Sequence, residues 1–279
     1  MVTKPKDDSL WSEFATFDNF LLAWQRLANV SSRMLSDELG TDVFAFNLHK
    51  NLEDLVERVD RESESYQPSF DNKVYVPKPS TTMRTMSMMS VPDLVTYQAM
   101  ANAIADACHH YLVTHENQHV WGNIYAGKGS PWMLKSWKYQ YNKFVDEIVQ
   151  IYKDGNTWIA STDIVSFYDT IDHQTLLHFI KKYAGADARF VEFFEKCLEK
   201  WASHNTDTSM SRGIPQGSNA SDFLANLYLY EIDQHMIVKG YQYARYVDDI
   251  RILGNEKSVV QRGLIDFDLE LKRYGLVAQ

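Results

Sequence analysis

The sequence predicts an α+β fold in which helices back an antiparallel sheet, and three observations support this. Residues 241–254 are rich in β-prone side chains on both sides of Asp248-Asp249, as expected of two strands joined by a tight turn. A second β-prone run begins at Trp158 and ends at Asp163. Long segments with apolar residues at helical spacing make up most of the remaining chain.

The first 70 residues are predicted to form a helical extension, and a polar stretch at 61–68 separates it from the next segment of the chain. Pro92 is predicted to begin a long helix through Tyr111, because proline fits the first helical turn. Further helices are expected at about 134–152, 173–183, 188–203, 219–238 and 257–274.

Asp248 and Asp249 form the first candidate site. Neighbouring carboxylates repel each other unless a cation offsets their charge, and Mg²⁺ prefers such hard oxygen ligands. Taken alone, an Asp-Asp turn is more often a solvated turn, since aspartate also caps local backbone groups. Asp163 supplies a third carboxylate at a predicted strand end, and Asp172 is predicted to cap the next helix.

Between these acidic segments lies a turn rich in Gly and Pro, residues 212–218, followed by a long helical pattern. Gln216 offers both a donor and an acceptor where this turn meets the helix.

In this order, the three segments resemble the palm motifs of reverse transcriptases. The resemblance covers about residues 70–275 and implies a right-hand polymerase, with fingers at 71–157 and a palm at 158–279 into which fingers elements 174–205 are inserted. Residues 269–279 resemble the helix and turn that precede a further strand in this family. The C-terminal end of the palm and the thumb are therefore expected to be missing.

The resemblance also implies roles for individual residues. Asp163, Asp248 and Asp249 are expected to bind two Mg²⁺ ions, with Mn²⁺ as a possible substitute, and to catalyse addition of dNTPs. Tyr168 falls where the family places a side chain that packs on the sugar and excludes a 2′-hydroxyl. We prefer Tyr168 to Phe167, because Tyr168 is the aromatic residue five positions after Asp163. The alternative is that one of the two is an ordinary core residue, since strand alternation would put them on opposite faces.

Residues 74–79 and 83–86 resemble the fingers of the same family. Lys78 and Arg84 match the positions that grip the incoming triphosphate, a task that suits a point charge and a planar fork. The alternative is that both are solvated charges beside a turn. Gln216 completes the expected nucleotide-binding set, because residues 213–217 resemble the template-primer motif.

The segment 219–233 narrows the resemblance to bacterial abortive-infection and other defence-associated reverse transcriptases, although Ser221-Asp222 stands where many relatives carry Ser-Pro. This implies antiphage defence, with an RNA template, a DNA product strand, or both as partners. Template-independent or protein-primed synthesis stays open as an alternative. A second protein or a missing C-terminal region would supply the thumb, and a homo-oligomer is possible.

Composition predicts a soluble, cytoplasmic protein that does not enter a membrane. No stretch approaches twenty uninterrupted apolar residues, and residues 1–8 lack a secretory core. The only cysteines, Cys108 and Cys197, are far apart, which suits a reducing compartment and excludes a cysteine-built zinc site. Each is predicted to be a small core residue.

The net charge of −9 has the wrong sign for a protein that holds a polyanion, so binding must depend on a locally basic channel. Candidate lysines and arginines alternate in part with aromatic residues on which bases could stack: Lys73, Lys78, Arg84, Lys128, Lys135, Lys138 and Lys143, with Trp132, Trp137, Tyr139 and Tyr141. For the aromatics, the simpler prediction is that they form the core face of an amphipathic helix.

Two rival functions come from other classes. His115, Glu116 and His119 fit the His-Glu-x-x-His pattern of zinc proteases, which requires both histidines on one helix face. The glycines at 122, 127 and 129 argue against a helix there. The second rival is a polymerase-shaped subunit that binds nucleic acid without synthesis, although such a role would not need all three aspartates.

Overall fold

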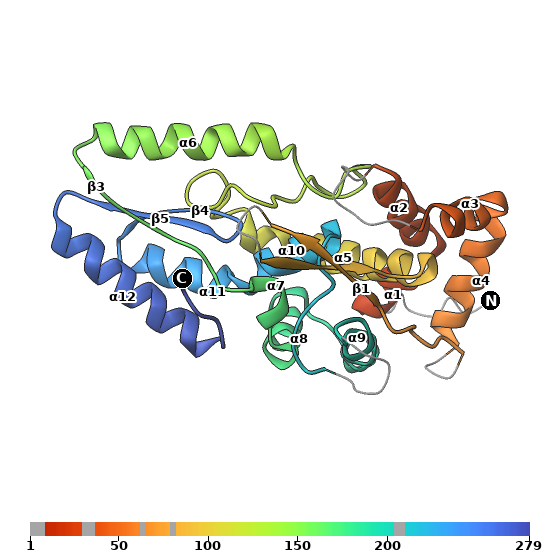
Figure 1. The fold of residues 1–279 in the computed structure, drawn as a ribbon. Coiled ribbons are helices and arrows are strands. Elements are labelled where there is room, and N and C mark those ends of the chain that lie inside the picture. Colours follow the sequence, from red (N-terminus) through yellow and green to blue (C-terminus); the bar gives the residue numbers. More distant parts are fainter. Residues whose placement is uncertain (1–8, 30–36, 62–64, 79–81, 204–209) are drawn as a thin grey trace.

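The computed structural model describes residues 9–29, 37–61, 65–78, 82–203 and 210–279. Residues 1–8, and residues 62–64 of the predicted polar separator, lie outside this part. The predicted α+β class is confirmed, with helices around a three-stranded antiparallel sheet and a separate two-stranded hairpin (Figure 1).

A long helix, α5 (Val91–Leu112), forms the centre of the helical body. It begins as predicted, with Pro92 in its first turn and the Ser90 hydroxyl accepting from the Asp93 N–H. Helices α1 (Leu10–Phe14), α2 (Phe17–Ala28), α8 (His173–Ala184) and α10 (Asn219–Tyr228) pack on α5. Cys108 of α5 and Cys197 of α9 (Ala188–Trp201) are free and buried, so their prediction as core residues is confirmed.

The N-terminal helices belong to the same hydrophobic core. The predicted helical pattern of this region appears as α1, α2, α3 (Glu38–Phe46) and α4 (Leu48–Asp60). Arg26 of α2 is 1% exposed and donates to the Asn102 side chain of α5 (2.6 Å) and to the Tyr125 hydroxyl (3.2 Å). A buried guanidinium needs such partners, and their placement couples α2 to the rest of the body.

The three-stranded sheet has the order β3-β5-β4, with β3 (Trp158–Thr162), β4 (Gln242–Tyr246) and β5 (Asp249–Gly254). Figure 1 shows α6 (Trp137–Lys153) on one side of this sheet and α11 (Tyr230–Val238) and α12 (Lys257–Arg273) on the other. Phe144 of α6 packs with Ala244 on the first side, and Phe267 of α12 with Tyr243 on the second.

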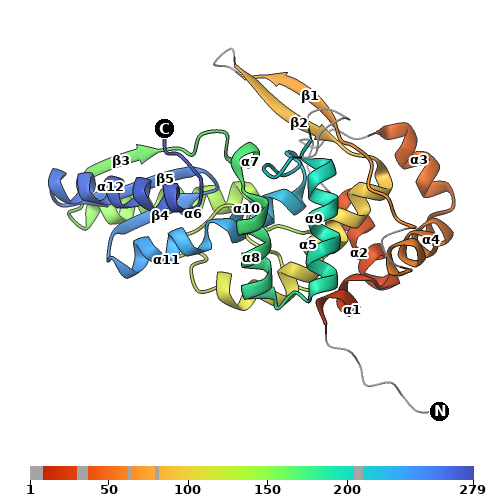
Figure 2. The same cartoon turned by 90° about the horizontal axis from the view of Figure 1, so that it is seen from below.

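The second sheet is the hairpin of β1 (Asn72–Pro77) and β2 (Met83–Met88), in which Val76 pairs with Arg84. Figure 2 shows it projecting from the helical body.

Two local predictions were wrong. The expected single helix at 219–238 is α10 and α11, which are interrupted at Leu229; the backbone angles of Leu229 remain helical, so hydrophobic periodicity continues across the break. Phe167 and Tyr168 do not alternate along a strand, because they lie on the short helix α7 (Phe167–Thr170). Among the described residues, no helix has the length and apolar character that crossing a membrane requires.

Candidate active site

The turn between β4 and β5 carries the acidic pair. Tyr246 pairs with Asp249, so Val247 and Asp248 form the two-residue connection. Val247 has φ +58°, a left-handed conformation that costs a residue other than glycine roughly 1–2 kcal/mol. Gly122 packs directly under this turn, because a Cβ at Gly122 would lie 2.4 Å from the Val247 nitrogen. The turn is thus held in a strained form by its surroundings.

A buried ion pair beneath the turn supplies much of that support. Arg245 of β4 and Asp233 of α11 are 1% and 2% exposed, and the guanidinium contacts both Asp233 oxygens, through Nε (2.8 Å) and Nη2 (2.5 Å). Arg245 Nη1 donates to Asn226 Oδ1 and to the Val247 carbonyl, both at 2.9 Å. Burial opposes the charge on Arg245, but Asp233 outweighs it and raises the arginine's pKa. The strained residue is therefore tied to α10 and α11.

Asp163 reaches the same end of the sheet from β3. Thr162 pairs with Ile250, so the next residue along β3 lies beside Asp249. Asp163 Oδ1 accepts from the Ile164 N–H (2.9 Å), and its backbone carbonyl accepts from the Gln279 N–H (2.8 Å). The pairing therefore brings Asp163 close to Asp248 and Asp249, which lie 85 and 86 positions further along the chain.

Electrostatic effects link the three carboxylates. The pKa of Asp248 is raised to about 6, first by burial and then by the negative charge of Asp163, with a smaller contribution from Asp249. Arg84 of β2 opposes the shift, which places its positive charge within range of Asp248. A cation bound here would relieve the repulsion, so the donor chemistry fits a hard divalent ion.

Asp249 has a competing partner. Both nitrogens of the Arg251 fork donate to the Asp249 carboxylate, with Nη2 to Oδ2 at 3.1 Å. Within the part of the chain that the structure describes, no three His, Cys, Asp or Glu side chains are arranged to hold a metal ion. A metal ion bound at this site would have to compete with Arg251 for Asp249.

Tyr168 lies beside these carboxylates. Its hydroxyl donates to Asp222 Oδ1 (2.5 Å), and its backbone carbonyl accepts from the Ile214 N–H (2.9 Å). Burial raises its pKa well above the usual value, and Asp222 and Asp248 add to the shift. Phe167 is 3% exposed and belongs to the hydrophobic core, and the partly buried Tyr168 packs against the same core.

The turn at 212–218 is joined to both neighbouring segments. Gly213 N–H donates to the Ile171 carbonyl (2.8 Å), and its own carbonyl lies 2.6 Å from His173 Nε2. The Gln216 carbonyl accepts from the Ser87 N–H of β2 (3.0 Å). Gln216 therefore lies where β2 meets the body. The predicted cap on α8 is also present, since Asp172 Oδ1 accepts from the Thr175 N–H (2.9 Å).

Lys78 and Arg84 lie on the hairpin and are exposed. The Lys78 N–H donates to the Thr82 carbonyl (2.7 Å), which closes the hairpin immediately beyond β1. The positive charge of Arg84 lowers the pKa of Asp248, against the larger effects of burial and Asp163, and so links this side chain to the acidic turn.

The candidate channel residues do not behave alike. The prediction that Lys73 lines a channel was wrong. Its ammonium is buried against Asp71 (2.7 Å) and the Trp201 carbonyl (2.8 Å) and so cannot face a channel. The prediction that the aromatics form a helix core was also wrong. All four are exposed, by 54% for Trp132, 50% for Trp137, 58% for Tyr139 and 43% for Tyr141.

The zinc-protease alternative is contradicted by the local structure. Helix α5 ends at Leu112, so His115 and His119 share no helix face. His115 is stacked on Tyr230 and lies 2.6 Å from the Gln234 amide, while Glu116 pairs with His109 at 3.1 Å.

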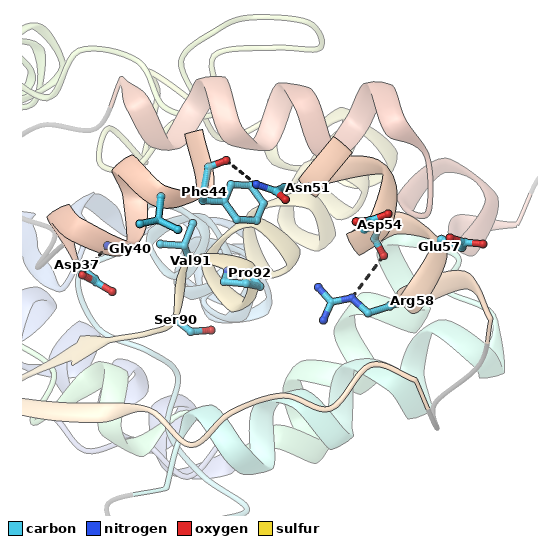
Figure 3. A pocket seen from close by; sticks show the side chains of 11 residues that line it. Asp37, Gly40, Phe44, Asn51, Asp54, Glu57, Arg58, Ser90, Val91 and Pro92 are labelled. Atoms are coloured by element: carbon cyan, nitrogen blue, oxygen red, sulfur yellow. Dashed lines mark hydrogen bonds between the residues drawn. The ribbon is translucent and has the colours of Figure 1, made fainter. Parts of the chain in front are cut away.

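A pocket of about 650 Å³ lies elsewhere, between α3, α4 and the start of α5 (Figure 3). Asn51 and Arg58 on its wall donate to backbone carbonyls of Phe44 and Asp54. No predicted site residue lines it.

Sequence reasoning missed Arg245, Asp233, Asn226, Asp222 and Arg251. A signal existed for the first three. Arg245 is a charge that directly follows the apolar residues Tyr243 and Ala244, and Asn226 and Asp233 interrupt the apolar pattern of 219–238. Both features indicate buried polar groups that need partners.

Comparison with known proteins adds an independent result. A family model described as reverse transcriptase (RNA-dependent DNA polymerase) matches residues 76–279. Protein YkfC of Escherichia coli K12 is 25% identical over 182 residues, 61% of this chain and 42% of that protein. Group II intron-encoded protein LtrA of Lactococcus lactis subsp. cremoris is 34% identical over 88 residues, 30% of this chain and 14% of that protein.

Among solved structures, a chain of a partial Cas6-RT-Cas1–Cas2 complex aligns with a TM-score of 0.51 and 19% identity. The alignment covers 95% of this chain and 43% of the other, and it supports the fold alone. This chain thus spans less than half the length of each of the three relatives.

Proposed function

Because the chain belongs to the reverse transcriptase (RNA-dependent DNA polymerase) family, we propose that it is a DNA polymerase that adds dNTPs by two-metal phosphoryl transfer. The observation that supports this most is the convergence of Asp163, Asp248 and Asp249 at one end of the sheet, where the pKa of Asp248 is raised by burial and then by the charges of the other two. Carboxylates held in mutual repulsion are suited to a cationic cofactor.

Asp163 and Asp248 would hold Mg²⁺, or Mn²⁺ in its place, and Asp249 would join them after it leaves Arg251. Bound there, two ions would offset the charge on the attacking and leaving oxygens of phosphoryl transfer. The protein's own contribution is to hold these carboxylates in place, and Gly122 and Arg245 do so through the turn at Val247.

The remaining predicted residues surround this centre. Arg84 and Lys78 of the hairpin would bind the triphosphate, as a fork and a point charge. Tyr168 would pack against the sugar and exclude a 2′-hydroxyl, and Gln216 would contact the nucleotide at the junction with β2. Arg84 opposes the rise in the pKa of Asp248, and the pKa of Tyr168 is raised by burial, then by Asp222 and to a smaller extent by Asp248. These effects support the two positions most directly.

Nucleic acid would bind where positive charge and exposed rings coincide. Residues 128–143 contain four lysines and no acid. Lys128 lies 3.9 Å from Glu13 and Asp106, and Lys135 lies 3.5 Å from Glu116, so the local positive charge depends mainly on Lys138 and Lys143. Lys138 and Lys143 lie over the rings of Trp137 and Tyr139, at 5.6 and 4.8 Å from the centroids. Exposed rings of this kind can stack bases of a single strand.

The test is incorporation of labelled dNTPs in the presence of Mg²⁺ or Mn²⁺, with an RNA template, a DNA template and no template in parallel. Asp163→Asn is expected to reduce incorporation by at least about 10³-fold, because a neutral amide is a poor ligand for the ions that supply several kcal/mol of charge stabilisation.

Asp42→Asn, a neutral replacement of an exposed aspartate on α3, is the matched control and should retain activity. Equal activity in Asp163→Asn and the unsubstituted protein would rule out the proposed chemistry. Incorporation that does not depend on added template would instead identify the template-independent or protein-primed alternative.

A second prediction concerns Arg251. Arg251→Gln is expected to tighten divalent-ion binding by about two- to fivefold, because an ion pair of this exposure contributes up to roughly 1 kcal/mol and no longer competes for Asp249. Mn²⁺ titration without nucleotide measures the affinity. Arg273→Gln, which removes an exposed arginine from α12, is the control, and an unchanged affinity in Arg251→Gln would show that the ion pair does not restrain the site.

We also propose a cytoplasmic role in antiphage defence, supported by the resemblance of residues 219–233 to abortive-infection enzymes. Phage plating on cells that produce the unsubstituted protein or Asp163→Asn tests this role. Protection by both proteins would show that defence does not require DNA synthesis.

A further inference from the structure

Tyr168 is fixed through both its backbone and its side chain. Helix α7 has only four residues and would not hold a ring rigidly by itself. The Tyr168 carbonyl accepts from Ile214, and the hydroxyl is anchored on α10 by Asp222 at 2.5 Å. Asp222 lies in the first turn of α10, a helix capped by the Ser218 side chain, so the anchor is itself well positioned.

A third residue completes the anchor. Asn123 Nδ2 donates to the Asp222 backbone carbonyl (3.1 Å), and the Asn123 side chain is among the groups that influence the pKa of Tyr168, where it opposes the larger effects of burial and Asp222. The Asn123 carbonyl in turn accepts from Asn226 (3.4 Å), a residue that also contacts Arg245. Asn123 comes directly after Gly122, which packs under Val247. The Tyr168 anchor and the acidic turn therefore share one hydrogen-bonded frame.

The direction of the Tyr168–Asp222 hydrogen bond is determined by charge. The pKa of Tyr168 is raised well above its usual value by burial, by Asp222 and by Asp248. The hydroxyl therefore stays protonated at neutral pH and donates to the Asp222 carboxylate. A hydrogen bond to an ionised acceptor is stronger than one between neutral groups. This hydrogen bond therefore restricts the movement of the Tyr168 ring more than packing alone would.

We propose that Asp222 is a positioning residue that fixes the Tyr168 ring and thereby sets the preference for 2′-deoxyribonucleotides over ribonucleotides. This proposal rests on the proposed function, because it assigns Tyr168 to the sugar. A ring excludes one extra hydroxyl only if it cannot move aside, and the Asp222 hydrogen bond opposes that movement. Asp222 itself would contact neither the ions nor the nucleotide.

The experiment compares kcat/KM for a dNTP and its matching rNTP in Tyr168→Phe, Asp222→Ala and the double variant. Each single variant is expected to lower the dNTP/rNTP ratio about tenfold, equivalent to one lost hydrogen bond. The double variant should show little further loss, because both changes remove the same interaction. Asp222→Asn keeps an acceptor oxygen and should retain most of the preference.

The control is a second tyrosine–aspartate hydrogen bond away from the site, from Tyr241 to Asp266 (2.6 Å). Tyr241→Phe removes an equivalent hydroxyl and should leave the dNTP/rNTP ratio unchanged. Thermal unfolding verifies that each variant is folded, and Asp222→Asn replaces Asp222→Ala in the comparison if alanine prevents folding, with a smaller loss expected.

A binding measurement separates this inference from the proposed function. Competition between a dNTP and an rNTP, with Ca²⁺ in place of Mg²⁺ to prevent turnover, gives the preference without synthesis. A protein that prefers the deoxy sugar but makes no DNA would remove the polymerase proposal and keep the role of Asp222. A ratio unchanged within about twofold in Tyr168→Phe and Asp222→Ala, or no preference in the unsubstituted protein, would overturn the inference.

Discussion

Asp248→Asn is expected to eliminate DNA synthesis and, at the same time, to stabilise the metal-free protein. Synthesis should fall by at least about 10³-fold, because an amide, like that of Asp163→Asn, is a poor ligand for the catalytic ions. Stability should rise because the negative charge of Asp248 is partly buried and lies beside Asp163 and Asp249. A neutral amide of nearly the same size removes that repulsion. Such a gain in stability with a loss of activity is common at functional sites that hold like charges together.

The pH dependence is set by the direction of the shift. The pKa of Asp248 is about 6 in the folded protein and 3.8 for an unperturbed aspartate, so the folded state binds the proton more tightly. Folding is therefore favoured by protonation below about pH 4, and this contribution is lost as the pH rises to about 6. A shift of this size corresponds to about 3 kcal/mol, which we discount to roughly 1–2 kcal/mol because Asp248 is partly exposed.

Thermal unfolding in EDTA measures the difference between Asp248→Asn and the unsubstituted protein. We expect the variant to melt about 2–6 °C higher at pH 8, and the two to converge at pH 4. Asp42→Asn controls for the loss of one negative charge from the chain. An Asp248→Asn variant that melts no higher than Asp42→Asn at pH 8 would contradict the repulsion. Saturating Mg²⁺ should reduce the advantage, because the ion binds the unsubstituted site better.

The parts of the site that the sequence predicts correctly depend on local patterns. The Asp248–Asp249 turn, the strand before Asp163 and the Asp172 cap each depend on residues within a few positions of one another. Once β3 pairs with β5 in antiparallel orientation, the register of the two strands places Asp163 beside the turn. Family resemblance supplied what local patterns could not, namely that these segments belong to one sheet.

The errors concern burial and partner choice, which depend on residues far apart in sequence. Lys73 has the spacing of a surface lysine, but α9 places the Trp201 carbonyl against it. The rings at 137, 139 and 141 have partly helical spacing, yet Phe144 occupies the contact with the sheet and leaves them exposed. In the sequence, Arg251 resembles an ordinary exposed charge on a strand. In the structure, its side chain lies on the same face of β5 as that of Asp249 and forms an ion pair with it.

Asp233→Ala is expected to cause the largest loss of stability, about 3–5 kcal/mol, because it leaves the Arg245 guanidinium buried without its counter-ion. The Tyr243 hydroxyl, which donates to Asp233 at 2.8 Å, loses its partner as well. Urea unfolding gives the free energy. We expect synthesis to fall even where the variant is folded, because Arg245 also holds the carbonyl of the strained Val247.

A matched surface pair shows whether burial is responsible. Asp268 and Lys272 form an ion pair one helical turn apart on α12, and Asp268→Ala should cost less than about 1 kcal/mol. In Asp233→Leu combined with Arg245→Met, no buried charge remains, so much of the stability should return while synthesis stays low. Stability without activity in this double variant would show that Arg245 and Asp233 serve the geometry of the turn more than they serve folding. If Asp233→Ala lowers the free energy of unfolding no more than Asp268→Ala does, the expected large contribution of the buried ion pair is wrong.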